Sequence, residues 1–212
     1  MKIVTELYHD SLQRLPDTGQ RILAHQVGDL MVVYQAYKHS IVDFAVKNQY
    51  LGGPDFSYSR MSWIKPGFLW MMYRCGWAEK ENQERVLALW IQKSDFENIL
   101  GQAVLSSFNP LYHESRERWE NDLATKDVRL QWDPDHDPYG NKMQRRAIQI
   151  GLKGDALANF GKKQIRLIED VTNFVNEQKL LLDNGQIDRL SIPVETIFDP
   201  GSKDLKDKIG IE

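Results

Sequence analysis

The sequence is short of cysteine and of long hydrophobic runs, and each shortage excludes a class of protein. Cys75 is the only cysteine among 212 residues, so neither an intramolecular disulfide nor a cysteine-rich zinc site can form. The most apolar stretches, Leu30–Tyr37 and Phe68–Tyr73, are far shorter than the ~20 residues that a membrane-spanning helix needs. Residues 1–20 lack the apolar core of a signal peptide. These features predict a cytoplasmic protein without a membrane partner.

Neither sign of charge predominates over the whole chain. Twenty-seven Lys and Arg residues stand against 30 Asp and Glu residues, a formal net charge of −3, so no overall basic field indicates nucleic-acid binding. The chain is 42% hydrophobic and 27% charged, which is typical of a globular protein. A chain of this length buries enough surface to fold without a structural metal.

The usual signatures of metal and nucleotide chemistry are also missing. The five histidines show no metal-ligand spacing. The aspartate-rich segment 133–138 around His136 lacks the glycine and the final glutamate of a calcium loop. There is no phosphate-binding P-loop, no Gly-x-Gly-x-x-Gly fingerprint and no Gly-x-Ser-x-Gly elbow. We therefore expect no metal cofactor.

The apolar pattern predicts a mixture of strands and helices within one domain. The expected strands are Arg21–Gln26, Leu30–Tyr37, Arg85–Ile91, Val128–Trp132, Arg146–Leu152 and Ile192–Phe198. The expected helices begin near Ile41, Pro66, Ser94 and Lys162, and the last runs to Leu182. Because strands and helices do not alternate regularly, we expect an α+β fold with a mostly antiparallel central sheet flanked by helices. Residues 1–198 should form this domain, and residues 199–212, poor in apolar side chains, a flexible C-terminal tail.

Three local signals predict where two of the helices begin or end. Pro66 suits the first helical position, where a missing N–H costs nothing. Gly76 is placed to end the same helix. Ser94 and Glu97 have the spacing of a capping box at the start of the next helix. A turn-rich segment, 133–140, should separate the strands that begin at Val128 and Arg146.

The strongest functional signal is a basic and aromatic block between Arg60 and Trp77. Residues 56–93 contain six Lys or Arg against three Glu, in a chain whose net charge is negative. Cations interleaved with aromatic rings suit a ligand that has both a π-face and phosphates. Lys65 and Ser62 come just before a helix, whose first N–H groups favour an anion. The structural alternative is that Trp70, Met71 and Met72 are core and the cations a solvated rim.

Two expected strands place polar residues on a common face. Alternation puts Gln35 and Tyr37 on one side of their strand, and Gln131 and Asp133 on one side of theirs. Each signal is weak by itself, because the polar faces of antiparallel strands normally look out to water.

Several of these segments resemble one uncharacterised family. They are Arg21–Gln26, Val33–Tyr37, Arg60–Pro66, Phe68–Arg74, Gln83–Ala88, Gln131–Pro134 and Ile148–Leu152. Together they are similar to domain of unknown function 4291, a family whose name carries no activity. Where its later motif has Asp-Pro-Glu-Arg, this chain has Asp133-Pro134-Asp135-His136, so a catalytic glutamate is not carried over.

The order of elements also resembles, more loosely, ADP-ribosyltransferase-like folds. That resemblance implies NAD as the cofactor and gives catalytic parts to Arg21, Ser62 and Asp133. The acid would stabilise the oxocarbenium charge that develops on the nicotinamide ribose. In this chain Gln131-x-Asp133 supplies a shorter acid than the usual glutamate.

Two functions follow, and they differ in geometry. The first is a nucleotide-binding, NAD-dependent ADP-ribosyltransferase-like transferase. In this hypothesis Arg21, Arg60, Lys65 and Arg74 hold phosphates, Gln35, Tyr37, Trp63 and Gln131 contact the rest of the ligand, and Asp133 is the acid. The alternative is a non-catalytic module that binds RNA or single-stranded nucleic acid. An enzyme needs the Gln131/Asp133 strand to face the basic block across one cleft, whereas a binding module needs only an open surface. The sequence identifies neither an acceptor nor an oligomeric partner.

Overall fold

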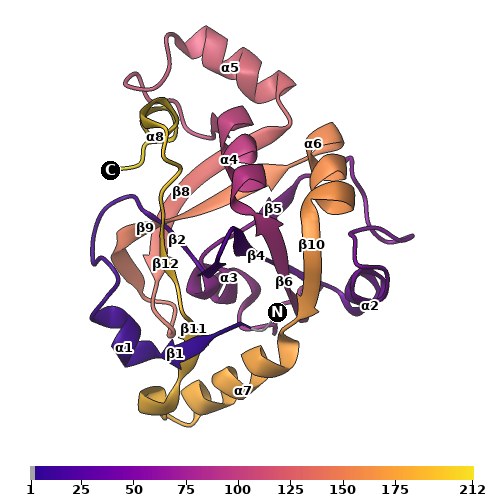
Figure 1. Cartoon of the computed structure of the whole chain (residues 1–212), viewed down its shortest axis with the longest axis vertical. Coiled ribbons are helices and arrows are strands. Elements are labelled where there is room, and N and C mark those ends of the chain that lie inside the picture. Colours follow the sequence, from indigo (N-terminus) through magenta and orange to yellow (C-terminus); the bar gives the residue numbers. More distant parts are fainter. Residues whose placement is uncertain (1–2) are drawn as a thin grey trace.

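Two four-stranded sheets form the frame of the computed structural model, which describes residues 3–212 (Figure 1). The first sheet has the order β10 (Ile165–Asp170), β6 (Arg85–Gln92), β4 (Leu30–Tyr37) and β3 (Gln26–Val27). The second has the order β5 (Ser62–Ile64), β9 (Lys142–Leu152), β8 (Val128–His136) and β7 (Val104–Leu105). Two smaller sheets pair β1 (Thr5–Leu7) with β11 (Ser191–Pro193) and β2 (Ile22–Ala24) with β12 (Thr196–Phe198). The strand pairs are antiparallel except for β7 with β8. The fold is therefore α+β, as expected.

Helices pack around these sheets and extend the molecule at both ends. They are α1 (Tyr8–Leu12), α2 (His39–Asn48), α3 (Phe68–Cys75), α4 (Lys93–Gln102), α5 (Arg116–Thr125), α6 (Gly154–Asn159), α7 (Thr172–Asp183) and α8 (Lys203–Ile209). A π-helical turn, Phe160–Gln164, follows α6, and a 3₁₀ turn, Ile187–Arg189, follows α7. Figure 1 shows α5 at one end of the molecule and α7 at the other.

The two large sheets meet where β4 passes the end of β5. The amide of Tyr34 donates to the carbonyl of Lys65 over 2.7 Å, and the amide of Lys65 donates back to Tyr34 over 3.1 Å. This isolated antiparallel bridge is the point at which the two sheets join. It fixes the backbone of Lys65 at the base of the opening between them.

The first sheet is buried on both faces, which explains the unbroken apolar runs of β4 and β6. Val33 and Leu89 face a cluster that includes Phe96 of α4, whereas Val32 and Trp90 face a second cluster with α3 and α7. Both strands consequently need apolar residues at successive positions, a pattern more familiar from parallel sheets. The strand predicted at Leu30–Tyr37 is confirmed, and the one at Arg85–Ile91 is one residue longer.

Two predicted helix starts are wrong, although both helices exist. The first begins at Phe68 after an extended Gly67, so Pro66 lies before the helix rather than in its first position. The second begins at Lys93 with no side-chain cap, which places Ser94 inside the helix. Gly76 does end α3, in the left-handed conformation with φ 58° that glycine adopts without strain.

The long helix predicted over Lys162–Leu182 is also wrong. The segment divides into a π-helical end, strand β10 and helix α7. Strand β10 pairs with the edge of β6, where Ile168 lies opposite Leu89, and this pairing outweighs the helical spacing of its apolar residues. The Asp170 side chain then accepts the amide of Thr172 over 3.0 Å, at the start of α7.

Other boundaries differ because tertiary contacts extend or divide the expected elements. Strand β8 continues through Asp133 to His136, inside the segment predicted as a turn. The strand predicted over Ile192–Phe198 is two short strands, β11 and β12, in different sheets. Strand β5 had no sequence signal; it forms because it pairs with β9.

The C-terminal segment is not the flexible tail that its composition predicts. Residues 203–209 form α8, and Ile209 is 1% exposed within the main hydrophobic cluster. Trp132 Nε1 donates to the carbonyl of Ile209 over 2.7 Å, and Gln20 Nε2 donates to that of Gly210 over 2.5 Å. Apolar side chains spaced among lysines and aspartates are enough to dock this helix.

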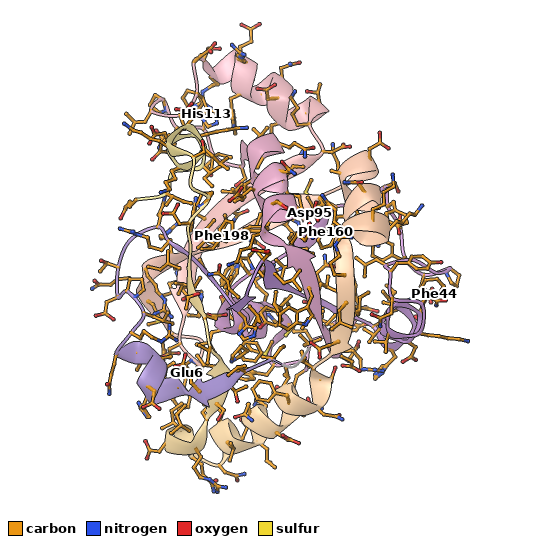
Figure 2. The ribbon with its side chains drawn as sticks, in the orientation of Figure 1. Glu6, Phe44, Asp95, His113, Phe160 and Phe198 are labelled. Carbon is orange, nitrogen blue, oxygen red and sulfur yellow. The ribbon has the colours of Figure 1, made fainter. Side chains whose placement is uncertain are left out.

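Figure 2 labels side chains both in the interior and near the ends of the molecule. Phe160 and Phe198 lie in the interior and are almost fully buried, whereas His113 lies near the end formed by α5. In residues 3–212, no helix combines the length and the hydrophobicity required to cross a membrane.

Candidate functional site

A polar cavity of about 570 Å³ lies where the two sheets meet. We call it the central cavity. Its lining comes from β4, β5, α3, β8, β9 and the segments beside them: Gln35, Ala36, Tyr37, Arg60, Met61, Ser62, Trp63, Lys65, Met71, Arg74, Gln83, Gln131, Asp133 and Gln149. The volume lies within the ~300–1,000 Å³ that is usual for sites of small molecules and cofactors.

The structure brings nine of the ten predicted site residues to this cavity. These are Gln35, Tyr37, Arg60, Ser62, Trp63, Lys65, Arg74, Gln131 and Asp133. The strand that carries Asp133 and the basic block therefore contribute to one cavity. Arg21 is the exception, because it lines a different and much smaller cavity.

Asp133 is held by two glutamine amides. Gln131 Nε2 donates to Oδ1 of Asp133 over 2.8 Å, and Gln149 Nε2 donates to Oδ2 over 2.8 Å. Gln131 shares a face of β8 with Asp133, and Gln149 lies opposite Gln131 on β9. One amide on each carboxylate oxygen fixes the orientation of the acid.

Gln149 is a site residue that the sequence reasoning missed. Its signal is a polar side chain within the apolar run Ala147–Leu152 of a buried strand. Gln149 is 7% exposed, and a buried amide requires a partner. Because its partner is on the neighbouring strand, the register of β8 with β9 was needed to find it.

Three cations of the central cavity have no acidic partner. Arg60, Lys65 and Arg74 make no ion pair within 4.0 Å of a carboxylate among the residues the structure describes. Arg60 and Arg74 are exposed, and the guanidinium of Arg74 lies 5.9 Å from the Trp70 ring centroid. Three cations with one carboxylate in a shared cavity favour an anionic ligand.

Lys65 differs from the two arginines because it is buried. It is 6% exposed, and its Nζ donates to the carbonyl of Trp63 over 2.8 Å. Burial, followed by the positive charge of Arg74, lowers the pKa of Lys65 to about 7, against the opposing influence of Cys75 and Asp133. An amine of this kind is charged in only part of the molecules near neutral pH.

Gln35, Tyr37 and Ser62 form a hydrogen-bonded triangle on the cavity wall. The Tyr37 hydroxyl donates to Gln35 Oε1 over 2.8 Å, and Gln35 Nε2 donates to Ser62 Oγ over 2.8 Å. The hydroxyls of Tyr37 and Ser62 are 2.6 Å apart. Burial raises the pKa of Tyr37 above its ordinary value, so the phenol stays protonated. The triangle ties β4 to β5 and presents hydroxyl and amide groups to a ligand.

Trp63 packs close to β9 because residue 151 is glycine. Trp63 pairs with Gly151 in the β5–β9 register. A Cβ at Gly151 would lie 2.7 Å from Met61 Sδ and 3.1 Å from Trp63 Cε2, too close for either side chain to keep its place. The glycine thus positions an aromatic ring at the cavity wall.

A second opening, the outer cavity, adjoins the central cavity. It has a volume of about 400 Å³ and shares Tyr37, Arg60, Met61 and Ser62 with the central cavity. Its other side carries Phe56 and the Lys38–Asp55 ion pair, with 3.0 Å between Nζ and Oδ1. The two cavities therefore adjoin at Ser62.

Arg21 lines the small cavity, whose volume is about 10 Å³, hardly room for one water molecule. The buried polar groups around it have protein partners: Arg145 Nε donates to Asp135 Oδ2 over 2.6 Å, and Glu195 Oε1 accepts the amide of Phe68 over 2.6 Å. The hydrogen bond from Lys206 contributes most to lowering the pKa of Asp199, and the charge of Arg21 contributes less. This arrangement is structural, and it keeps Arg21 out of the central cavity.

A further cavity of about 610 Å³ lies beside α5. Its lining has both signs of charge, including Arg118, Asp122, Lys126 and Asp127, and Arg118 is ion-paired with Glu114. Within residues 3–212, no three His, Cys, Asp or Glu side chains gather in a way that could hold a metal ion. The central cavity is thus the better candidate site.

Fold and site together define an α+β domain with a cation-rich, amide-lined cavity between two joined sheets. Residues 21–198 match the model of a family described as domain of unknown function (DUF4291). The chain belongs to this family, which covers the central cavity in full. No curated protein sequence matches the chain.

Proposed function

We propose that the protein is a cytoplasmic, nucleotide-dependent transferase whose leading substrate is NAD, similar in chemistry to ADP-ribosyltransferases. One observation supports this most strongly: Asp133, fixed by two amides, shares a cavity with three cations that have no acidic partner within residues 3–212. A surface that only binds nucleic acid has no need of an oriented carboxylate. A transferase uses one to stabilise positive charge that develops during the reaction.

The residues of the central cavity divide into three roles. Arg60 and Arg74 hold the diphosphate, since exposed guanidinium groups bind phosphate oxygens in pairs. Trp63, with the amides and hydroxyls of the triangle, contacts the base and the nicotinamide. Asp133 faces the nicotinamide ribose, whose bond to nicotinamide breaks with a gain of positive charge on the sugar.

The outer cavity gives the acceptor a route to the same point. An acceptor held there lies against Lys38 and Asp55 and reaches the central cavity past Tyr37 and Ser62, which line both openings. The reacting atom of the acceptor would then enter the central cavity, which Ser62, Lys65 and Asp133 line. This geometry suits transfer of a group from one ligand to the other.

The proposal is tested by titration calorimetry and by nicotinamide release. NAD, ATP and a short single-stranded RNA are titrated separately into the full chain, and free nicotinamide is measured after incubation with NAD. The proposal expects NAD to bind and nicotinamide to appear. Binding of the RNA, with neither NAD binding nor nicotinamide release, would replace it with the nucleic-acid-binding module.

A further inference from the structure

Lys65 occupies a position that is fixed by the backbone on both sides. Its amide and carbonyl bond to Tyr34, and the preceding residues of β5 pair with β9. Pro66 and Gly67 follow and lead directly into α3. The side chain therefore leaves the junction of the two sheets and reaches the central cavity from its base.

The amine of Lys65 has fewer partners than a charged lysine requires. An ammonium group has three N–H donors, and only one hydrogen bond, to Trp63, is formed among the described residues. By contrast, the half-buried Lys38 and Lys206 each have a carboxylate partner, Asp55 and Asp199. A neutral amine fits the site better, because it has fewer hydrogens to satisfy and a lone pair to offer.

The groups around Lys65 come from four parts of the cavity. Arg74 of α3, Asp133 of β8, Tyr37 of β4 and Arg60 before β5 line the central cavity with Lys65, and the buried Cys75 of α3 is near enough to influence its pKa. Desolvation and Arg74 favour the neutral amine, whereas Cys75 and Asp133 favour the charged one. Burial with a neighbouring cation is a known way to prepare a lysine for proton transfer at neutral pH.

Asp133 already has another task in the proposed reaction. Both of its oxygens already accept a glutamine N–H, and its charge is needed on the carboxylate during transfer. The two tasks of the reaction, stabilising positive charge and removing a proton, therefore require two groups. In the central cavity, Asp133 is suited to stabilising positive charge and Lys65 is suited to removing a proton.

We propose that Lys65 is the general base of the transferase, and this role rests on the proposed function above. The neutral amine takes the proton from an O–H or N–H of the acceptor as that atom bonds to C1 of the ribose. The bond between C1 and the nicotinamide nitrogen breaks, and its electron pair leaves with neutral nicotinamide. Lys65 ends as an ammonium and later gives the proton to water.

Lys65→Arg separates this role from simple phosphate binding. Arginine keeps the positive charge and the donors but does not act as a base near neutral pH. If Lys65 is the general base, the turnover of this variant should be roughly 100-fold or more below that of the wild-type protein. Its NAD affinity should stay within about threefold of the wild-type value. Lys47→Arg, the same change on an exposed lysine of α2, is the matched control and should keep wild-type turnover.

A chemical measurement on the wild-type protein keeps the proposal testable if the arginine variant fails to fold. Competitive acetylation with acetic anhydride, read by mass spectrometry, reports the fraction of Lys65 that is neutral at each pH. Reactivity that reaches half its maximum near pH 7, and a turnover that rises over the same range, are expected. Reactivity that rises only in alkaline solution would overturn the proposal.

The outcomes distinguish the base from the function on which it rests. If the wild-type protein releases no nicotinamide from NAD, both proposals are overturned. If it does, and Lys65→Arg retains wild-type turnover, only the general base is overturned and Lys65 is a phosphate ligand. Lost turnover with retained NAD affinity, beside an active Lys47→Arg, supports Lys65 as the base.

Discussion

The central cavity and the small cavity both border α3, yet they differ in volume and in the pairing of their most buried ionisable groups. In the small cavity Arg145 is paired with Asp135, and Glu195 accepts the amide of Phe68. In the central cavity Arg60 and Arg74 have no acidic partner, and the cavity is large enough for a ligand. Charges satisfied by the protein stabilise the fold, whereas unpaired cations around an open cavity are available to an anion.

Lys65 of the central cavity and Glu195 of the small cavity are both buried ionisable groups, and they can be compared directly. Burial is the largest influence on both: it lowers the pKa of Lys65 to about 7 and raises that of Glu195 to about 8. The neutral form is favoured in each case, because desolvation penalises either charge. Glu195 accepts the first amide of α3, whereas Lys65 lines the open central cavity.

The largest effect is expected at Asp133. Asp133→Asn keeps the size and removes the charge, so turnover should fall by roughly two to three orders of magnitude, as when one transition-state contact is lost. NAD affinity should change little, because the charge that Asp133 stabilises appears only during the reaction. Nicotinamide release and calorimetry measure the two quantities.

The matched control is Asp137→Asn, the same change in the turn that follows β8. Asp137 accepts the amides of Tyr139 and Asn141, and asparagine can accept both. Equal turnover in the two variants would show that the charge of Asp133 is not used in catalysis.

The next effect concerns the packing that supports β8 rather than the cavity. Ile209→Ala should lower the free energy of unfolding by about 2–4 kcal/mol, because it removes a fully buried side chain. NAD affinity should stay unchanged, since α8 contacts Trp132 on the strand but does not line the cavity. Urea unfolding measures the loss, with the exposed Lys203→Ala as control. Unchanged stability would show that residues 199–212 behave as the flexible tail that the composition predicts.

Glu195 should make stability depend on pH. Its pKa is about 8 in the folded protein against an ordinary 4.5, so the folded state binds more protons between these values and stability falls as pH rises. Glu195→Gln should remove a slope of up to about 1.4 kcal/mol per pH unit. Burial lowers the pKa of His136, which also makes stability depend on pH between about pH 5 and pH 7. The difference in slope between the two proteins in this window therefore isolates Glu195, and the shift of Lys65 acts above it. An identical slope in both proteins would show that Glu195 is ionised in the fold.

Local periodicity predicted the parts of the site that lie on single strands. Gln35 with Tyr37, and Gln131 with Asp133, share faces because side chains alternate along any strand. Gln149 escaped detection because its role depends on the register of β9 with β8, a long-range pairing. Arg21 was misplaced for the same reason: its neighbours are set by contacts with distant segments.

The fold shows the same division between local and long-range information. Strands β4 and β6 were recognised from continuous apolar runs that burial on both faces requires. The segment that contains Ile165 and Ile168 has spacing that suits a helix or a strand, and the exposed edge of β6 decides between them. For α8, the single buried Ile209 is too small a signal within a charged segment.

The most direct test of the central claim compares one unpaired and one paired arginine in the binding of NAD. Arg74→Gln removes a cation without an acidic partner, and Arg118→Gln removes an exposed one that is paired with Glu114. Calorimetry should show affinity about tenfold weaker for Arg74→Gln, roughly 1.4 kcal/mol, and wild-type affinity for Arg118→Gln. Equal NAD affinity in the two variants would contradict the claim that unpaired cations mark the ligand site.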